Sequence, residues 1–332
     1  MISITQEQIT NNWEISNLKT PLVSIQCITY NHENFIAQAL EGFLIQKTTF
    51  PFEVIVHDDA STDNTANIIR EYEQKFPKII KPIYEKENLY KKRDGSFTKI
   101  VNNACTGKYI ALCEGDDYWI DENKLQRQIE FLEKNPEYGF CYTKSKVFDQ
   151  KYGIFLNSMG NGKISFREIY LTYDIPTATI VYRRDLHSKY LEFKEQNGKK
   201  WIVGDYPLSL WFALNSKIKY FDLETSVYRV LEKSASHFTT FEEIENFKFN
   251  IYENIQLLFL NIYKTDYNEL KQQSLNDINL YLCKKAILLG LYTKAKHYSK
   301  KIICSDLKSI LIKILCHDQI TFHLISFFLK KR

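Results

Sequence analysis

The sequence predicts an α/β fold in which a mostly parallel β-sheet is flanked by helices and followed by a helical C-terminal region. In the first part of the chain, short apolar runs rich in β-branched residues alternate with segments whose apolar residues recur at helical spacing. Such alternation is typical of βαβ units with right-handed crossovers. From residue 241 onwards the pattern is helical, and the only glycine there is Gly290. We therefore place a boundary near residue 240, after a short N-terminal extension at 1–20 and an α/β domain at 21–240.

The first two predicted strands are each followed by a predicted helix. "VSIQCITY" (23–30) is a β-rich apolar run, and in the next segment six apolar residues lie at helical spacing: Phe35, Ile36, Ala39, Leu40, Phe43 and Leu44. "FEVIVH" (52–57) is the second strand. Thr62 or Asp63 can cap the helix predicted in "TDNTANIIREYEQKF".

Two further strands complete the parallel part of the predicted sheet. They are "IIKPIYE" (79–85) and "KYIALC" (108–113), and a helix with Leu125, Ile129 and Leu132 on one face follows the second of them. The middle of the chain is mixed: we expect strands within 139–148 and 175–186, a helix at 206–215, and strands with a turn at 217–230.

Composition restricts the class of protein. The formal net charge of +4 over 332 residues is too small to suggest nucleic-acid binding. Seven cysteines include Cys27, Cys113 and Cys141 within apolar runs, where a reduced cysteine behaves as a small hydrophobic residue. No C-x-x-C pair indicates zinc, and the polar start does not resemble a signal peptide. A reducing, cytoplasmic location is the resulting prediction.

The basic C-terminal region allows two interpretations. Residues 241–332 contain 14 Lys and Arg against 9 Asp and Glu, and no run reaches the eighteen or so apolar residues of a membrane-spanning helix. The segment 310–332 is amphipathic with a basic end. It either packs on the protein, where it could also form a homodimer, or lies on an anionic membrane surface as a peripheral contact.

Polar and acidic residues follow the strands of the predicted sheet. In open α/β sheets, ligands bind beyond the carboxyl ends of the strands. The residues at these positions are Thr29, Tyr30 and Asn31, then Asp58 and Asp59, and finally Glu114, Asp116 and Asp117. Two like charges about 4 Å apart repel by roughly 4 kcal/mol at the effective dielectric of a surface cleft, so we expect a cation or a raised pKa among the last three.

Two interpretations of these carboxylates are open. They could hold Mg²⁺ or Mn²⁺, which binds one or two carboxylates together with substrate phosphates, and an aspartate after the second strand could accept from a pyrimidine N3–H. Alternatively, Asp116 and Asp117 cap the next helix with Glu114 in solvent, while Asp58 and Asp63 form turns or caps.

Three motifs together identify a family. "VSIQCITYNHENFI", "FEVIVHDDASTDNT" and "GKYIALCEGDDYWIDENKL", in this order and at these separations, resemble the family 2 glycosyltransferases, which have the Rossmann-like GT-A fold. The similarity covers roughly residues 21–240. It implies a nucleotide-diphosphate sugar donor, Mn²⁺ or Mg²⁺ at the diphosphate, inversion at the anomeric carbon, and a glycan or lipid-linked acceptor, as in surface polysaccharide biosynthesis.

The resemblance also implies roles for single residues. Thr29, Tyr30 and Asn31 would line the nucleotide pocket, and Asp59, with Asp58 beside it, would recognise uracil, so that the donor is a UDP-sugar carrying a hexosyl or N-acetylhexosaminyl group. The family's D-x-D motif is Glu114-Gly115-Asp116 here. Asp116 would be the metal ligand, and Glu114, which replaces the commoner aspartate, would face the ribose or the water shell of the metal.

Later segments supply the remaining site residues of the resemblance. Asp205 in "WIVGDYPLSLWFA" would be the base that deprotonates the acceptor hydroxyl, although it could also cap the helix that follows. His237 would contact the metal or a phosphate, and Arg229 would be a phosphate or structural partner. Asn88 could line the pocket. Lys99 or Arg93 could reach the diphosphate, or their segment could be a solvated run of charges.

Other classes fit the sequence less well. A dehydrogenase needs a glycine-rich turn after its first strand, and "ITYNHEN" has none. A phosphatase needs a nucleophilic aspartate there, where this chain has Thr-Tyr-Asn. A non-catalytic protein that binds glycans or nucleotides on the same scaffold has no need of Asp59, Asp116 and Asp205, all of which are present.

Overall fold

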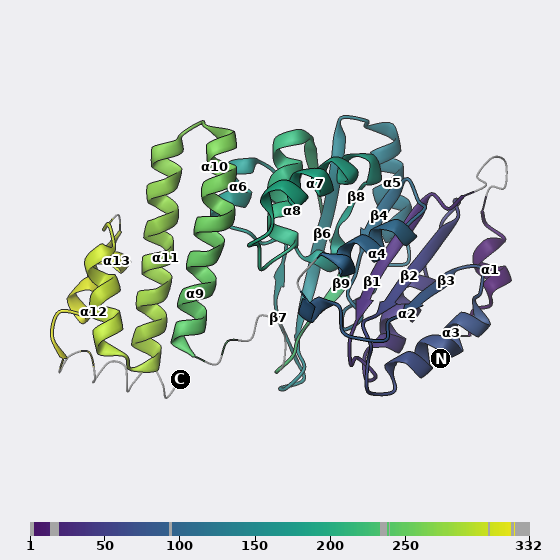
Figure 1. The fold of residues 1–332 in the computed structure, drawn as a ribbon, viewed down its shortest axis with the longest axis horizontal. Coiled ribbons are helices and arrows are strands. Elements are labelled where there is room, and N and C mark those ends of the chain that lie inside the picture. Colours follow the sequence, from purple (N-terminus) through teal and green to yellow (C-terminus); the bar gives the residue numbers. More distant parts are fainter. Residues whose placement is uncertain are drawn as a thin grey trace. The chain divides into compact units, whose positions relative to one another are not determined.

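The computed structural model describes residues 3–13, 20–92, 95–232, 238, 240–304, 306–319 and 322 (Figure 1). The chain forms two compact units, one made of Met1–Phe193 and Trp211–Ser234 and the other of Lys194–Leu210 and Ala235–Arg332. The predicted α/β class with a helical C-terminal region is confirmed. Residues 194–210 group with the C-terminal helices, so the second unit is built from two stretches of the chain.

The first unit contains a nine-stranded sheet in which the predicted βαβ strands lie side by side. The strand order is β3-β2-β1-β4-β8-β6-β9-β5, with β7 paired to β6. β1 pairs in parallel with β2 and β4, and β2 pairs in parallel with β3. Beyond β4 the sheet is mixed, since β6–β9 is parallel and the other pairs are antiparallel. The strands are β1 (Val23–Thr29), β2 (Phe52–Asp58), β3 (Ile80–Tyr84), β4 (Tyr109–Leu112), β5 (Tyr118–Trp119), β6 (Tyr138–Asp149), β7 (Ile154–Met159), β8 (Val181–Arg183) and β9 (Lys217–Val230).

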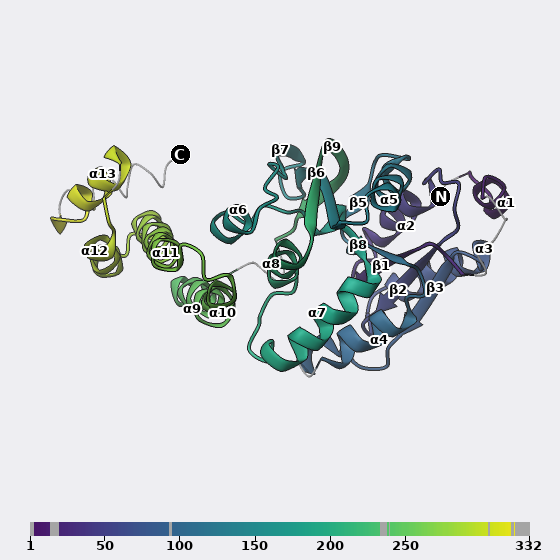
Figure 2. The same ribbon diagram turned by 90° about the horizontal axis from the view of Figure 1, so that it is seen from above.

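Helices cover both faces of this sheet. Figure 2 shows α2 and α5 on one face and α4 and the start of α7 on the other. Ile25, Val54 and Val56 are fully buried between them, because a parallel strand covered on both faces is apolar throughout. Cys27, Cys113 and Cys141 are buried reduced thiols, as predicted. The helices are α1 (Gln6–Thr10), α2 (Ile36–Leu44), α3 (Thr65–Lys75), α4 (Ser96–Ala104), α5 (Lys124–Lys134), α6 (Phe166–Leu171), α7 (Arg184–Asn197) and α8 (Asp205–Asn215), with 3-10 turns η1 (Tyr90–Lys92) and η2 (Thr177–Thr179).

One predicted element of the sheet is wrong. Residues 217–230 were expected to form strands with a turn, but they form the single long strand β9. Thr143 pairs with Phe221 and the next residue, Lys144, pairs with Glu224, so two residues of β9 bulge out without ending the pairing. A bulge of this kind absorbs the polar, turn-like residues within a continuous strand.

The second unit contains the helical C-terminal region. Its core includes Leu282, Cys283, Ala286 and Ala295, all fully buried. Gly290 ends the longest helix with φ of 78°, a left-handed conformation that favours glycine. Among the described residues, no helix is both long and apolar enough to cross a membrane. The helices are α9 (Phe241–Ile251), α10 (Leu257–Tyr263), α11 (Tyr267–Leu289), α12 (Tyr292–Lys301) and α13 (Leu307–Leu315), with a π-helical turn η3 (Tyr252–Gln256).

Candidate functional site

The three predicted motifs meet at the carboxyl edge of the parallel strands. Just beyond β2, the Asp59 N–H donates to the Thr29 carbonyl at 3.0 Å. Just beyond β4, the Gly115 N–H donates to the Ile28 carbonyl at 2.9 Å. Because both flanking segments stay bonded to the end of β1, the polar residues that follow the three strands lie beside one another.

Thr29 and Gly115 fit closely against each other at this edge. A Cβ atom on Gly115 would lie 2.7 Å from Thr29 Oγ1 and 3.1 Å from His32 Nδ1, which is too close for any other residue without displacement. Thr29 is only 1% exposed, and its hydroxyl oxygen has no hydrogen-bond partner among the described residues. The glycine of the E-G-D motif therefore lets the carboxylate segment approach the end of β1.

The side chain of Asp58 also has a buried oxygen that could accept a hydrogen bond from a ligand. Its Oδ1 atom is buried and has no hydrogen-bond partner among the described residues. Burial raises the pKa of Asp58 above its usual range, against hydrogen bonds from Ser61 that act in the opposite direction. Buried polar atoms of native proteins are nearly always paired, so unpaired oxygens on Thr29 and Asp58 indicate a place for a polar ligand.

Asp59 and Asn88, both predicted to bind the nucleotide, are brought together. The two carboxylate oxygens of Asp59 accept the backbone N–H groups of Leu89, at 2.7 Å, and Tyr90, at 3.0 Å. The Asn88 side chain donates to the Asp59 carbonyl at 3.3 Å. Asp59 thus holds the turn after β3, and each of its oxygens keeps a second lone pair with which to accept from a ligand.

The other nucleotide-binding candidates differ in their surroundings. Asn31 has φ of 55°, and its Oδ1 accepts the Thr62 N–H at 2.8 Å, so it joins the loops that follow β1 and β2. Tyr30 is half-buried, with Lys91 Nζ 5.8 Å from its ring centroid. Lys99 is exposed on α4, whereas Arg93 lies outside the described residues. The nucleotide contacts of these residues remain predictions.

His32 was not singled out in the sequence, although it lies at the candidate site. Its Nε2 atom is 3.9 Å from Asp116 Oδ2, and its Nδ1 atom is buried without a hydrogen-bond partner in the described part of the chain. Burial lowers the pKa of His32, and the charge of Asp116 opposes that shift. Its position three residues beyond Thr29, at a strand end, is the signal that could have identified it.

Arg229 has the structural role that was one of its two alternatives. Its backbone N–H donates to Asp117 Oδ1 at 2.8 Å, while the guanidinium donates to the Asp116 carbonyl and to Gln38 Oε1. The guanidinium also lies 4.4 Å from the Tyr118 ring centroid. This cation from β9 therefore fastens the carboxylate segment to α2.

Asp117 meets the expectation of a raised pKa. It is buried, and burial, reinforced by the charges of Asp116 and Glu114, raises its pKa well above the usual range. The alternative that Asp116 or Asp117 caps the next helix is not supported, since the N-cap of α5 is Asn123. Of the three acidic residues, Glu114 and Asp116 are the two that are half-buried rather than enclosed.

The remaining carboxylates fit a hard divalent cation. Among the described residues, no group of three or more His, Cys, Asp and Glu side chains forms a complete metal cage. Mg²⁺ and Mn²⁺ do not need one, because they commonly take one or two carboxylates and complete their shell with water and substrate phosphates. Asp116, whose side chain is 24% exposed, and Glu114 supply such a donor set. His237, the other predicted ligand, lies outside the described residues.

Asp205, the predicted base, is the first residue of α8 and belongs to the second unit. The Tyr206 N–H donates to Asp205 Oδ1 at 2.9 Å, and Ser209 Oγ donates to the Asp205 carbonyl at 2.9 Å. The carboxylate thus interacts with the start of the helix. Its catalytic role stays a prediction.

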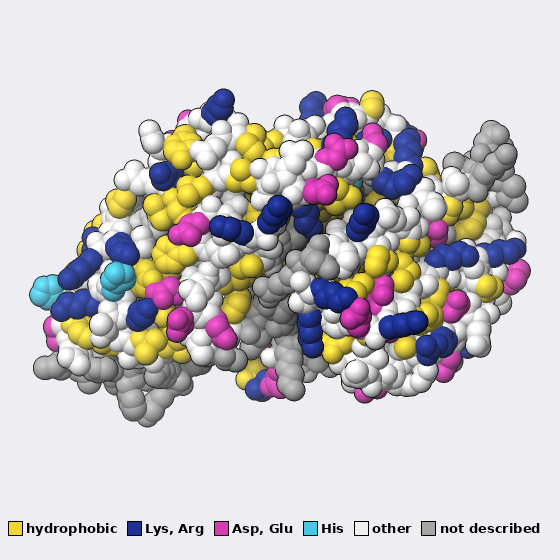
Figure 3. All heavy atoms as spheres, in the orientation of Figure 1, with side chains coloured by type: hydrophobic (Ala, Val, Ile, Leu, Met, Phe, Trp, Pro, Cys, Tyr) yellow, Lys and Arg dark blue, Asp and Glu magenta, His cyan; other side chains and the backbone are white. Residues whose placement is uncertain are grey.

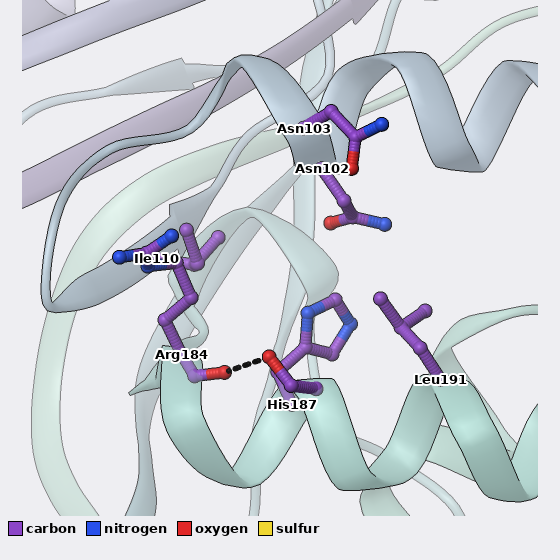
Figure 4. A pocket seen from close by; sticks show the side chains of 7 residues that line it. Asn102, Asn103, Ile110, Arg184, His187 and Leu191 are labelled. Carbon is purple, nitrogen blue, oxygen red and sulfur yellow. Dashed lines mark hydrogen bonds between the residues drawn. The ribbon is translucent and has the colours of Figure 1, made fainter.

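A separate cavity of about 200 Å³ lies between α4 and α7 in the first unit (Figure 4). Its lining includes Asn102, Asn103, Arg184 and His187. Ser188 Oγ donates to the Arg184 carbonyl at 3.1 Å, and the Arg184 guanidinium donates to the Cys105 carbonyl at 3.2 Å. None of the predicted site residues lines this cavity.

Part of the chain matches the sequence model of a known protein family. Residues 24–191 match the model of the family described as "Glycosyl transferase family 2". This match covers half of the chain and includes β2, β4, all of β1 except Val23, and the residues at the carboxyl ends of these strands.

Several curated proteins are similar to parts of the chain. The uncharacterized protein Rv1520 of Mycobacterium tuberculosis is 39% identical over 165 residues, which are 49% of this chain and 47% of that protein. TuaG of Bacillus subtilis, whose name describes a teichuronic acid biosynthesis glycosyltransferase, is 32% identical over 36% of this chain and 43% of its own length. The chain thus spans about half the length of the curated relatives it matches.

Solved structures share the fold over nearly the whole chain. S. aureus TarS in complex with UDP-GlcNAc has a TM-score of 0.58 at 17% identity, covering 93% of this chain and 90% of that one. The mannosyltransferase PcManGT of Pyrobaculum calidifontis, in complex with GDP-Man and Mn²⁺, has a TM-score of 0.52 at 14% identity, covering 96% and 88%.

Proposed function

Because the chain belongs to glycosyl transferase family 2 and has the GT-A fold, we propose that it transfers a sugar from a UDP-sugar to a hydroxyl of a glycan or lipid-linked acceptor. The observation that carries the proposal is the pair of buried oxygens, Thr29 Oγ1 and Asp58 Oδ1, that lack partners among the described residues. They lie at the sheet edge where Asp59 and Asp116 also converge.

A pyrimidine nucleotide suits the residues at this edge. An aspartate oxygen can accept the uracil N3–H, and the carboxylate of Asp59 is held in place by Leu89 and Tyr90. Support also comes from relatives, since the TarS structure contains UDP-GlcNAc and the name of TuaG refers to teichuronic acid biosynthesis. From these two similarities we propose that the donor of this chain is a UDP-sugar and that the chain acts in surface polysaccharide biosynthesis.

Asp116, with Glu114 beside it, would hold Mn²⁺ or Mg²⁺. Such an ion neutralises the charge that develops on a departing diphosphate. The residues of this chain position the metal ligand and supply the base. Arg229 fixes the backbone of Asp116, and Asp205 accepts the proton of the acceptor hydroxyl. The hydroxyl oxygen bonds to the anomeric carbon as the bond to the diphosphate oxygen breaks, from the opposite face, so that the configuration inverts.

Thermal unfolding with a panel of nucleotide sugars tests the proposal. We expect UDP-sugars to raise the Tm in the presence of Mn²⁺, and a chelator to remove the increase, because a ligand that binds only the native state stabilises it. GDP-, CMP- and ADP-linked sugars serve as controls for the base.

Product analysis then separates binding from catalysis. With a stabilising UDP-sugar and a mixture of glycan and lipid-linked acceptors, we expect release of UDP that depends on both donor and acceptor. Indifference of the Tm to every nucleotide would refute the proposed donor site. Stabilisation without turnover on any acceptor would favour a binding protein over a transferase.

A further inference from the structure

Helix α13 carries an apolar stripe that faces solvent. The exposed fractions are 78% for Leu307, 44% for Ile310, 54% for Leu311 and 58% for Ile314. Spacings of three, four and seven residues place these side chains on one face of the helix. Ser309, Ile312 and Cys316 are buried, so the helix already packs on the second unit through a different face.

This surface lies in a basic part of the chain. Between Asp277 and Asp318 the sequence contains eight lysines and a single acidic residue, Asp306. Asp306 caps α13, because its carboxylate accepts the Ser309 N–H at 2.7 Å. Lys300 and Lys301, at the end of α12, are exposed. Figure 3 shows lysines, together with several acidic residues, interspersed with apolar side chains over the C-terminal helices.

From the exposed stripe and the lysine-rich sequence that contains it, we propose that α13 lies on a lipid surface with anionic headgroups. An apolar face bordered by lysines is the pattern of helices that lie at the boundary between headgroups and acyl chains. Each lysine near an anionic membrane adds attraction that falls off within a Debye length. A second copy of the chain suits this face less well, because pairing two such faces would bring lysines of the same charge together.

Vesicle co-sedimentation of the full chain tests this inference and does not depend on the proposed transferase activity. We expect the protein to sediment with vesicles of phosphatidylcholine and phosphatidylglycerol in equal amounts, and to stay in the supernatant with phosphatidylcholine alone. High salt should release it, because attraction between lysines and headgroups is screened.

Two variants with matched controls identify the surface. Changing Leu307, Leu311 and Ile314 together to Gln should lower the partition coefficient by about tenfold or more, since the apolar contribution is lost. The control changes Ile154, Phe155 and Leu156 to Gln, because these β7 residues are similarly exposed, at 51%, 59% and 46%. For charge, Lys300→Glu with Lys301→Glu is compared with Lys199→Glu and Lys200→Glu, an exposed lysine pair elsewhere in the same unit.

The outcomes are distinct. Loss of vesicle binding in the α13 apolar variant and in the Lys300/Lys301 variant, but in neither control, with an unchanged Tm, supports the inference. Equal binding of the wild type and the α13 apolar variant, or loss in the β7 control instead, overturns it. Failure of the wild type to sediment, combined with a dimer that the α13 apolar variant converts to monomer in light scattering, would overturn it in favour of a second copy of the chain.

Discussion

The side-chain carboxylates of Asp59 and Asp117 accept backbone N–H groups from segments far away in the sequence, and among the described residues those of Asp58 and Asp116 have no such bond. Asp59 bonds to residues 89 and 90, and Asp117 bonds to Arg229. Asp58 keeps a buried oxygen without a partner among the described residues, and Asp116 is half-exposed. Substitutions at these positions should therefore separate effects on folding from effects on ligand binding.

Asp205→Asn tests the proposed base. The amide cannot take a proton from the acceptor hydroxyl, so we expect turnover to fall by about 100-fold or more, while donor binding is retained. Its Oδ1 can still accept the Tyr206 N–H, so the Tm should change little. Turnover is measured as UDP release and donor affinity by calorimetry. Full turnover of this variant would show that Asp205 is not the base.

Gly115→Ala tests the close approach of the E-G-D segment to β1. The new methyl group would lie 2.7 Å from Thr29 Oγ1, and overpacking of this kind typically costs about 1–3 kcal/mol in the free energy of unfolding. Gly204→Ala is the control, because a Cβ atom there meets no atom within 4 Å. Urea unfolding measures both. Equal stability of the two variants would contradict the packing described here.

Lys124 gives stability a measurable dependence on pH. This side chain is buried, and its Nζ atom lies 4.1 Å from the Trp119 ring centroid and donates to Gln128 Oε1 at 2.7 Å. Burial lowers its pKa from the ordinary 10.5 to about 8, against the opposing effect of Cys141. Between these two values the unfolded chain binds a proton that the native chain does not, so the Lys124 contribution to the free energy of unfolding rises with pH.

Lys124→Met removes this titration. Relative to the variant, the wild type should gain on the order of 3 kcal/mol in the free energy of unfolding between about pH 7 and about pH 10. Chemical denaturation measures the free energy of unfolding of the wild type and the variant at the two pH values. Subtracting the change in the variant from that in the wild type removes the contribution of the other groups that titrate at high pH. A difference that stays constant with pH would mean that Lys124 keeps its charge when buried.

At the scale of elements, β9 links the carboxylate segment to the rest of the first unit. Its Arg229 reaches α2 through Gln38 and the segment after β4 through Asp116 and Asp117. A buried guanidinium left without one of its acceptors is costly, because hydrogen bonds to charged groups are among the stronger ones.

Gln38→Met and Gln38→Glu form a matched pair that tests this link. Met removes the acceptor at nearly the same volume, and we expect a loss of about 1–3 kcal/mol in the free energy of unfolding. Glu keeps an acceptor oxygen for the guanidinium, so its loss should be smaller. Equilibrium unfolding provides the comparison. If Met is tolerated as well as Glu, the bond between Arg229 and Gln38 contributes little.

Local patterns predicted some elements and missed others for identifiable reasons. Strands β1, β2 and β4 were predicted because apolar runs reveal strands buried on both faces, and β3 was predicted from its β-rich run although only Ile80 in it is buried. β7 has five exposed residues out of six and so shows no alternation, and β5 has only two residues. The strand-end residues were predicted because parallel strands end at one edge. The bond between Arg229 and Asp117 joins positions 112 residues apart, which no local pattern encodes.

At the scale of the whole chain, residues 194–210 belong with the C-terminal helices. Trp201 Nε1 donates to the Asn254 carbonyl at 2.9 Å, and Gln256 Nε2 donates to the Tyr206 hydroxyl at 3.1 Å. The Trp201 ring also lies 6.0 Å from the ring of Phe259. A boundary near residue 240, as placed from the sequence, therefore separates residues 194–210 from the C-terminal helices with which they interact.

Truncation after residue 240 should accordingly destabilise what remains. Residues 194–210 would lose their partners at 254, 256 and 259, so we expect a lower Tm and more binding of a hydrophobic dye. Trp201→Ala in the full chain removes part of the same contact and should lower the Tm by on the order of 5 °C. A truncated chain that unfolds at the same temperature as the full one would show that these contacts contribute nothing.

The two-part composition of the second unit also bears on how relatives could exchange this region by recombination. A single crossover near residue 240 would pair the helices of one parent with the 194–210 segment of another, mismatching the partners of Trp201 and Tyr206. A compatible exchange needs either one crossover near residue 194 or three crossovers, near residues 194, 211 and 235, and both would transfer Asp205 together with the helices. Natural chimaeras should therefore inherit residues 194–210 and 235–332 from the same parent.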